Sequence, residues 1–280
     1  MRRFTVYLAV WSLAVLLLVV LTFAASTSSG QSNRKRDQDA ARQNALLLRE
    51  LSWTFGSKPQ RGWYLYMPLI KKLIKTKDDP SSRKFAAAVA RWQKKSGRNP
   101  SGVLDDQTLY AMIGVWQAAR LKDRTLAPPE QLLTAPISDF YDPTRAEELR
   151  QVERRTYAAY KRLVAVAVAD RSLGLGRTKK GELAANEKFL KIISAYRSPA
   201  YQEKLRRESP NSGTAGLAVN SPHFTGRALD LYVGGEPVDT QDPNRALQVQ
   251  TRVYQWLVQN AERFGFRPYC YEPWHWEFVK

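Results

Sequence analysis

The sequence has few residues of the types that build disulfides and metal clusters. Its 280 residues include one cysteine, Cys270, and two histidines, His223 and His275. A single cysteine excludes an intrachain disulfide framework and a cysteine-rich zinc cluster. Two histidines exclude a histidine-rich metal site, but they leave room for one site built from both. Acidic residues are also scarce, because 26 Asp and Glu stand against 44 Lys and Arg.

The resulting formal net charge of +18 implies a polyanionic neighbour. Nucleic acid, an anionic membrane and an acidic wall polymer all fit this charge. The hydrophobic content of 44% and the charged content of 25% are ordinary for a globular protein, which argues against wholesale disorder. The length allows one large domain or two small ones.

The first 25 residues contain a long apolar run. Arg2 and Arg3 precede an uncharged segment at residues 4–25, which as a helix would be about 33 Å long and could cross a membrane core. We therefore expect residues 1–25 to be a signal anchor, with a cleaved signal peptide as the alternative. Residues 26–44 are rich in Ser, Gln, Asn and Arg, a composition that predicts a flexible stalk.

Residues 45–125 are predicted to form a small basic helical domain. Two runs repeat apolar residues at the i, i+3, i+4, i+7 spacing of one helix face: Phe85, Ala88, Val89 and Trp92, then Leu109, Met112, Ile113 and Trp116. Residues 58–98 hold twelve Lys or Arg and two Asp, a net charge of +10. Because export removes nucleic acid as a partner, we expect this domain to bind acidic wall polymers or anionic lipid.

A second domain is predicted at residues 137–280, after a proline-rich linker at residues 126–136. The pattern mixes helices and strands without βαβ repetition, so we expect an α+β fold with a small antiparallel-type sheet of mixed strand order and flanking helices. The expected elements are helices at 149–167 and 249–264, and strands at 190–194, 228–233 and 274–279.

His223 lies close in sequence to an aspartate of an expected strand. In the strand at 228–233, Asp230 points away from the face that carries Leu229 and Leu231. Gly226 permits a tight turn that returns His223 to the side of Asp230. The turn and the strand together are expected to place an imidazole beside a carboxylate.

The second histidine, His275, also has carboxylates nearby. Two imidazoles and one carboxylate are the ligand count of a catalytic zinc, with a fourth position open to water. Glu272, three residues before His275, is placed to take a proton from that water. Glu277 shares the strand face of His275, so it is expected to support the ligands, with a ligand role for Glu277 as the alternative.

The combined motifs resemble a known enzyme family. Residues 221–230 read S-P-H-F-T-G-R-A-L-D and residues 272–275 read E-P-W-H. They match S-x-H-x-x-G-x-A-x-D followed by E-x-x-H, the signature of the LAS-type zinc peptidases, and the ending is close to the VanY-like D-alanyl-D-alanine carboxypeptidases. Residues 194–198, S-A-Y-R-S, followed by Gln202, resemble a further segment of that family. The resemblance covers roughly residues 157–280.

This resemblance implies a role for each matched residue. The implied ligands of Zn²⁺ are His223, Asp230 and His275. The implied catalytic residues are Glu272, as general base and then acid, and Arg197, as the cation that faces the carbonyl oxygen or the terminal carboxylate of the substrate. The implied substrate-binding residues are Ser198, Gln202 and Ser221.

The basic domain resembles the second half of a peptidoglycan-binding helical domain. Residues 85–93 read F-A-A-A-V-A-R-W-Q, and residues 101–108 read S-G-V-L-D-D-Q-T. The family shows A-V-x-x-F-Q-x-x-x-G, then D-G-x-x-G-x-x-T, so Ser101 stands in place of its Asp and Asp105 in place of its second Gly. We expect exposed aromatic residues of the segment 63–66 to stack on wall glycans, with a core position as the alternative.

These features predict an exported zinc D,D-carboxypeptidase of the bacterial cell envelope. It would hydrolyse the terminal D-Ala-D-Ala bond of peptidoglycan stem peptides, a substrate that follows from the resemblance, whereas the residues by themselves indicate zinc-dependent amide hydrolysis. One alternative is a zinc endopeptidase of the same fold that cuts within stem peptides or cross-links. Another is a wall-binding protein without enzymatic activity.

Overall fold

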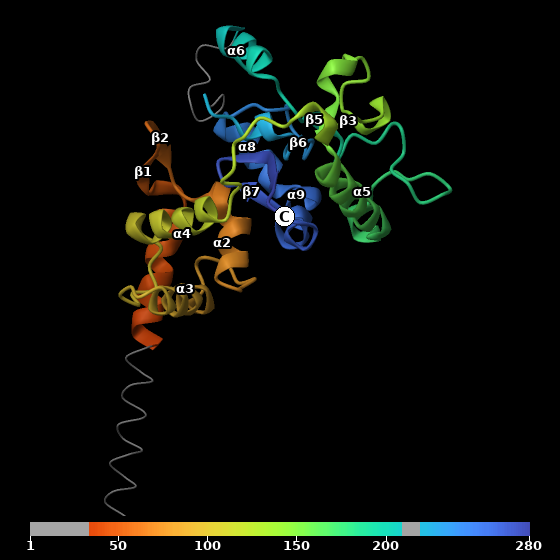
Figure 1. The fold of residues 1–280 in the computed structure, drawn as a ribbon. Coiled ribbons are helices and arrows are strands. Elements are labelled where there is room, and N and C mark those ends of the chain that lie inside the picture. The colour runs from red at the N-terminus through yellow and green to blue at the C-terminus, as the bar shows by residue number, and fades with distance from the viewer. Residues whose placement is uncertain (1–33, 209–218) are drawn as a thin grey trace, which may run out of the picture. The chain divides into compact units, whose positions relative to one another are not determined.

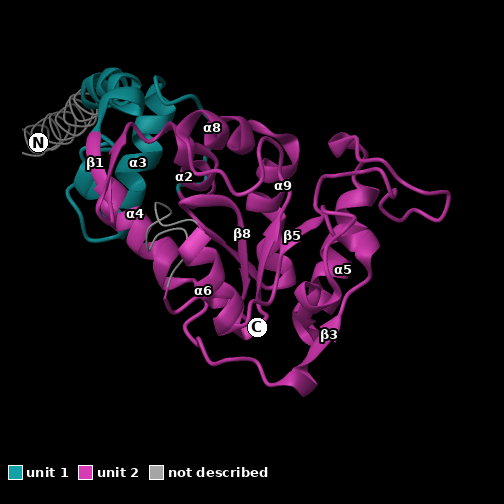
Figure 2. Ribbon diagram, turned by 90° about the horizontal axis from the view of Figure 1, so that it is seen from above, with its two compact units in different colours: residues 1–51, 74–108 teal, residues 52–73, 109–280 magenta. Residues whose placement is uncertain are grey.

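The computed structural model describes residues 34–208 and 219–280 (Figure 1). The expected signal anchor lies outside these residues. No helix within them is long and apolar enough to cross a membrane. The chain divides into two compact units, coloured separately in Figure 2. The first unit joins the residues up to 51 with residues 74–108, and the second joins residues 52–73 with residues 109–280. This division differs from two consecutive domains separated at residues 126–136.

The first described element of the first unit is a helix over residues 34–50, and residues 34–44 of this helix belong to the segment predicted to be a flexible stalk. Ala40 packs against Ala86 in a small core cluster. The buried amide of Asn44 donates a hydrogen bond to the carbonyl of Gly102 at 2.9 Å. The helix buries small and polar residues instead of a stripe of large apolar ones, so the polar composition of the segment concealed it.

The helix α3 (Arg83–Lys95) forms the second part of the first unit. Ser82 caps it, because its hydroxyl accepts a hydrogen bond from the backbone amide of Phe85 at 3.1 Å. At the other end Gln93 is buried, donates to the carbonyl of Val103 at 3.0 Å and accepts from the amide of Gly102 at 2.9 Å. Gln93, the last residue of the motif F-A-A-A-V-A-R-W-Q, therefore fixes the loop that follows the helix.

The second unit contains the sheets and most of the helices. Its strands are β1 (Ser52–Phe55), β2 (Lys58–Arg61), β3 (Leu132–Thr134), β4 (Gln151–Glu153), β5 (Ile192–Ser194), β6 (Ala228–Leu231), β7 (Phe266–Tyr269) and β8 (Glu272–Phe278). Its helices are α2 (Met67–Leu73), α4 (Asp106–Ala118, which begins in the first unit), α5 (Arg154–Ala169), α6 (Pro199–Glu208), α8 (Asp242–Gln250) and α9 (Arg252–Asn260).

The largest sheet has the strand order β5-β6-β8-β7, and every neighbouring pair in it is antiparallel. Two further antiparallel pairs are β1-β2 and β3-β4. Helix α8 contacts β8, and the turn after α9 contacts both α5 and β7. Antiparallel sheets combined with helices confirm the predicted α+β class.

The hairpin β1-β2 lies where the sequence analysis expected helix. Its connection holds Gly56, whose φ of +58° is a conformation that glycine adopts readily. A Gly-Ser pair between the short segments S-W-T-F and K-P-Q-R is a hairpin signal. It was not used, because the helical periodicity at residues 85–92 and 109–116 led to a helical prediction for the whole domain.

Two expected helices have different bounds in the structure. Helix α5 begins at Arg154, since the Glu153 carboxylate accepts from the amide of Thr156 at 2.7 Å and so caps it. The expected helix at 249–264 is interrupted at Thr251, which is extended at φ −66° and ψ 145° and separates α8 from α9. Gly265 ends this region at φ +93°.

The aromatic segment at residues 63–66 lies in the core of the second unit. Trp63 and Tyr66 are fully buried. The Tyr66 ring stacks on Trp116, and its hydroxyl accepts a hydrogen bond from Arg245 Nη2 at 3.0 Å. The expectation that the aromatic residues of this segment stack on wall glycans was wrong for these two, because the fold uses their area for packing.

Candidate metal centre

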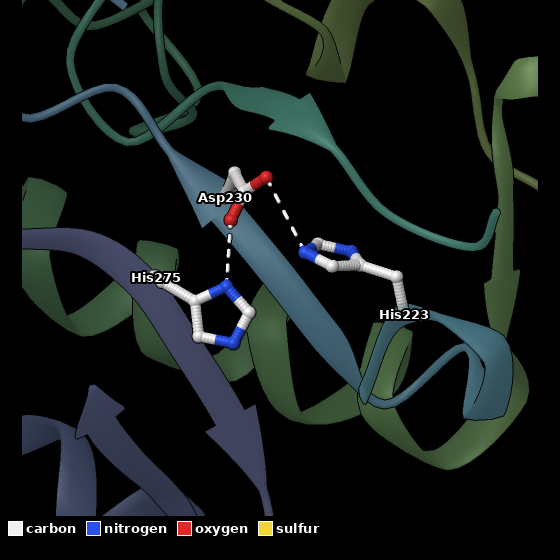
Figure 3. A group of neighbouring side chains, drawn as sticks. All are labelled: His223, Asp230 and His275. Carbon is white, nitrogen blue, oxygen red and sulfur yellow. Dashed lines mark hydrogen bonds and ion pairs between the residues drawn. The ribbon is translucent and has the colours of Figure 1, made fainter. Parts of the chain in front are cut away.

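Two antiparallel strands of the main sheet bring together the residues that the sequence analysis selected. Asp230 on β6 pairs directly with His275 on β8. Side chains at directly opposed positions lie on the same sheet face with Cβ atoms about 5 Å apart. His223 enters from the 3₁₀ turn Pro222–Thr225, which immediately precedes β6. Figure 3 shows the Asp230 carboxylate between the two imidazole rings.

The turn that carries His223 depends on Gly226. Gly226 has a φ of +64° and ends the 3₁₀ turn. A Cβ at this position would lie 2.9 Å from the backbone nitrogen of Glu153 and 2.9 Å from Leu132 Cδ2. At the start of the turn, the Ser221 hydroxyl accepts from the amide of His223 at 3.3 Å. The motif S-x-H-x-x-G therefore builds the turn as well as supplying the imidazole.

The three polar groups are close enough to share one cation. Asp230 Oδ1 lies 2.9 Å from His275 Nδ1, and Asp230 Oδ2 lies 3.4 Å from His223 Nε2 (Figure 3). One ligand atom from each residue lies within 4.8 Å of the others. All three residues are buried, and each exposes only 1–4% of its surface to solvent. Two imidazole nitrogens and a carboxylate oxygen are a donor set that suits Zn²⁺.

The outer nitrogen of each imidazole has an oxygen acceptor. His223 Nδ1 lies 2.6 Å from the carbonyl oxygen of Ala195, and His275 Nε2 lies 3.3 Å from Glu277 Oε1. A carbonyl only accepts, so His223 Nδ1 carries the hydrogen and its Nε2 lone pair faces Asp230. Acceptors behind histidine rings are the usual support of metal-ligating imidazoles. The arrangement fits a bound metal.

The two imidazoles have opposite electrostatic surroundings. Burial, together with the charge of Arg197, lowers the pKa of His223 to about 4, so this ring is neutral as a ligand must be. For His275, burial lowers the pKa, but hydrogen bonds to Asp230 and Glu277 outweigh this effect and raise the pKa to about 9. A cation that binds at His275 must therefore displace a proton.

Arg197 lies against the carboxylate of the group. Its Nη2 donates to Asp230 Oδ2 at 2.6 Å, and its Nε donates to the Ser194 hydroxyl at 2.8 Å. Its Nη1 lies 3.4 Å from Gln202 Oε1. Ser194 and Gln202, the first and last residues of the motif S-x-Y-R-S…Q, therefore both contact the Arg197 guanidinium. Ser198 has a different contact, because its hydroxyl accepts from the amide of Tyr201 at the start of α6.

Glu272 is buried at the edge of the same group. Its Oε2 lies 4.0 Å from His275 Nδ1. Burial raises the pKa of Glu272 to about 7, and the nearby Asp230 charge adds to this effect while His275 opposes it. A carboxyl group with such a pKa can take up and release a proton near neutral pH.

Glu277 lies on the opposite side of His275 from Asp230. It is fully buried, and its carboxylate accepts from Arg120 Nη2 at 2.5 Å and from the amide of Leu121 at 2.9 Å. Although burial raises its pKa, the bond to His275 and the charge of Arg120 hold the pKa well below its usual range. Arg120 was not predicted from the sequence, since no local motif marks a contact across 157 residues.

Cys270 has no part in this group. It is buried, and burial raises the pKa of its thiol to about 12. A thiol with this pKa is inert at neutral pH.

Comparisons with known proteins agree with both resemblances. Residues 180–280 match the VanY family, D-alanyl-D-alanine carboxypeptidase. Residues 64–112 match a putative peptidoglycan binding domain. No curated protein matches the chain significantly in sequence.

Among solved structures, the LdcB LD-carboxypeptidase is similar, with 21% identity over 56% of this chain and 71% of that chain and a TM-score of 0.38. A variant of the vancomycin resistance D,D-pentapeptidase VanY in complex with Zn(II) shares 20% identity over 59% of this chain and 89% of that chain, with a TM-score of 0.34. VanYB in complex with D-alanine-D-alanine shares 20% identity over 56% of this chain and 86% of that chain, with a TM-score of 0.32. The predicted resemblance is confirmed: residues 180–280 match the VanY family, residues 64–112 before them match a peptidoglycan-binding domain, and the chain is an enzyme of the peptidase type.

Proposed function

We propose that the chain is a zinc-dependent D,D-carboxypeptidase that removes the terminal D-alanine from peptidoglycan stem peptides. The observation that carries the proposal is the buried group of His223, Asp230 and His275, in which each imidazole is already supported from behind by an oxygen acceptor. This group lies within the residues that match the VanY family.

The proposed mechanism divides the work between the ligands and Glu272. His223, Asp230 and His275 would hold zinc, which would supply a Lewis acid for the peptide carbonyl and for the attacking water. Glu272 takes the proton of the attacking water and passes it to the leaving amine of D-alanine. Its burial, its raised pKa and its position 4.0 Å from His275 support this role.

Arg197 orients Asp230 and binds the substrate. Three of the five guanidinium N–H groups point to Asp230, Ser194 and Gln202. The remaining two make no hydrogen bond among the described residues, and we assign them to the carbonyl oxygen or the terminal carboxylate of the peptide. We assign the hydroxyl of Ser221 and the side chains of Gln202 and Ser198 to the polar lining of the substrate cleft.

We also propose where the chain acts. A peptidase that carries a peptidoglycan-binding-type region works on the cell wall, and residues 1–25 would anchor it on the extracytoplasmic side of the envelope. The basic side chains of the first unit would contact acidic wall polymers or anionic lipid.

Mass spectrometry of purified pentapeptide stems and cross-linked dimers tests this function. The zinc-loaded chain is expected to shorten the pentapeptide by one alanine, and a chelator should stop the reaction. Cleavage within stems or cross-links instead would establish the endopeptidase alternative. Intact peptides after prolonged incubation with the zinc-loaded chain would contradict the proposal and favour a wall-binding protein.

The ligand assignment predicts the metal content of single variants. The purified chain should hold one zinc per molecule, and His275→Ala should lose most of it, because two ligands bind zinc far more weakly than three. Elemental analysis of the dialysed proteins measures this. Full zinc occupancy in His275→Ala would refute the assignment.

A further inference from the structure

We infer that Arg120 is a positioning residue of the metal centre, which acts by holding Glu277 against His275. Arg120 lies outside both the residues that match the peptidase family and those that match the peptidoglycan-binding domain. The inference rests on the proposed zinc site, and it adds to that site a residue from the segment that follows α4.

The carboxylate of Glu277 is held by donors from this segment. Arg120 donates to Oε1 through Nε at 3.1 Å and through Nη2 at 2.5 Å. The backbone amide of Leu121 donates to Oε2 at 2.9 Å, and Arg124 Nη1 lies 3.4 Å from Oε1. Glu277 is fully buried, and a buried carboxylate keeps one orientation only while such donors surround it.

Arg120 is itself fixed on its other sides. Its guanidinium lies 3.9 Å from the centre of the Tyr269 ring, and its Nη1 donates to Gln117 Oε1 at 3.0 Å. The Tyr269 ring in turn lies 5.9 Å from the His275 ring, edge to face. The guanidinium therefore has a defined place beside the sheet, as a planar group with several donors requires.

Glu277 connects Arg120 to the proposed metal ligand His275. Its Oε1, the atom that Arg120 binds, lies 3.3 Å from His275 Nε2. An acceptor at Nε2 sets the ring orientation that aims Nδ1 at Asp230, 2.9 Å away. Without Arg120, the Glu277 carboxylate can turn away, and the ring loses the contact that fixes its ligating nitrogen.

A purely structural role predicts a different outcome. If the ion pair only fastens the segment after α4 to β8, its loss lowers stability but leaves the geometry of the metal unchanged. The experiment must therefore read the metal directly, in addition to folding and activity.

The full-length wild type is compared with Arg120→Ala, Glu277→Gln and the control Lys122→Ala. Lys122 is an exposed cation of the same segment whose amine contacts the carbonyl of Gln117. Zinc affinity is measured by competition with a chelator, the ligand geometry by the visible spectrum of the Co²⁺-substituted protein, and folding by thermal unfolding. Arg120→Ala and Glu277→Gln should bind zinc about 10- to 100-fold more weakly and shift the cobalt spectrum. Lys122→Ala should match the wild type.

The outcomes separate this inference from the proposed function. A folded Arg120→Ala variant with the zinc affinity and cobalt spectrum of the wild type overturns the positioning role. Absence of zinc binding in the wild type overturns the proposed function itself. If Arg120→Ala does not fold, Arg120→Lys is compared instead, since it keeps the charge without the forked donors. A shifted cobalt spectrum in this variant supports the inference, and an unchanged one overturns it.

Discussion

At the residue scale, Glu272 is the side chain whose replacement separates binding of metal from turnover. It is buried beside the group of His223, Asp230 and His275 but does not belong to it. Glu272→Gln should keep about one zinc per chain while turnover falls by at least about 10²-fold, the usual contribution of a general base. Elemental analysis and D-alanine release measure the two effects. A metal-free Glu272→Gln protein would make Glu272 a ligand instead.

Single residues also show how far the sequence could lead. The alternation of β6 selected Asp230, and the short spacing in sequence selected His223 beside Asp230 and Glu272 beside His275. These residues could be predicted because their contacts are local or lie between strands with clear patterns. The contacts of Arg120 and Arg124 with Glu277 could not be predicted, since nothing near residues 119–124 indicates a partner at Glu277. Long-range side-chain contacts of this kind depend on the completed fold.

At the scale of elements, the turn before β6 is a constrained connection to the site. Gly226→Ala meets two penalties, a left-handed backbone at φ +64° and contact of the new Cβ with Glu153 and Leu132. Gly174→Ala is the matched control, because its φ is +68° and nothing lies within 4 Å of a Cβ there. We expect the control to lose about 1–2 kcal/mol of unfolding free energy and Gly226→Ala to lose about 1–3 kcal/mol more.

Chemical denaturation of the two glycine variants measures this difference. Zinc affinity should also fall in Gly226→Ala, because a displaced turn moves His223, and should remain unchanged in Gly174→Ala. Equal losses of stability in both variants would show that the contacts around Gly226 can relax.

Elements differed in how well the sequence predicted them. The strands at the site, β5, β6 and β8, lie close to their expected bounds. Strands β5 and β8 contain β-branched or aromatic residues, and β6 was found from the alternation that places Leu229 and Leu231 on one face. The helix at residues 34–50 and the hairpin β1-β2 were missed, since the helix buries small residues and the hairpin consists of two four-residue strands.

At the scale of the whole molecule, positive charge concentrates on the exposed face of α3. The exposed basic residues of this helix and the turn after it are Arg83, Lys84, Arg91, Lys94, Lys95 and Arg98, and the helix itself contains no acidic residue. Arg83 and Lys84 also line a hollow of about 430 Å³ with Arg34 and Asp37. This face suits an extended polyanion at the cell wall.

Binding to wall sacculi tests the basic face. The full-length double variant Lys94→Glu/Lys95→Glu should pellet with sacculi less than the wild type at low salt. The double variant Lys179→Glu/Lys180→Glu changes the net charge equally on an exposed loop of the second unit and should pellet like the wild type. The difference should shrink at 0.5 M salt, because exposed charges are screened within about 10 Å at 0.1 M and less above it. Equal pelleting of both variants at low salt would refute the assignment.

The division of the second unit into two separate stretches of chain has a consequence for how the protein folds. Residues 52–73 are separated in sequence from the rest of the second unit, which begins again at residue 109. Their contacts therefore span long stretches of chain, as in the hydrogen bond between Tyr66 and Arg245 across 179 residues. Contacts between such distant residues require large loops to close, which slows folding. Arg120 and Glu277 are 157 residues apart, and they meet only when a loop of that length has closed. Capture of a metal ion at this group, with Glu277 held by Arg120, would therefore come late in folding, and a chain in which this loop is still open would hold the ion less tightly.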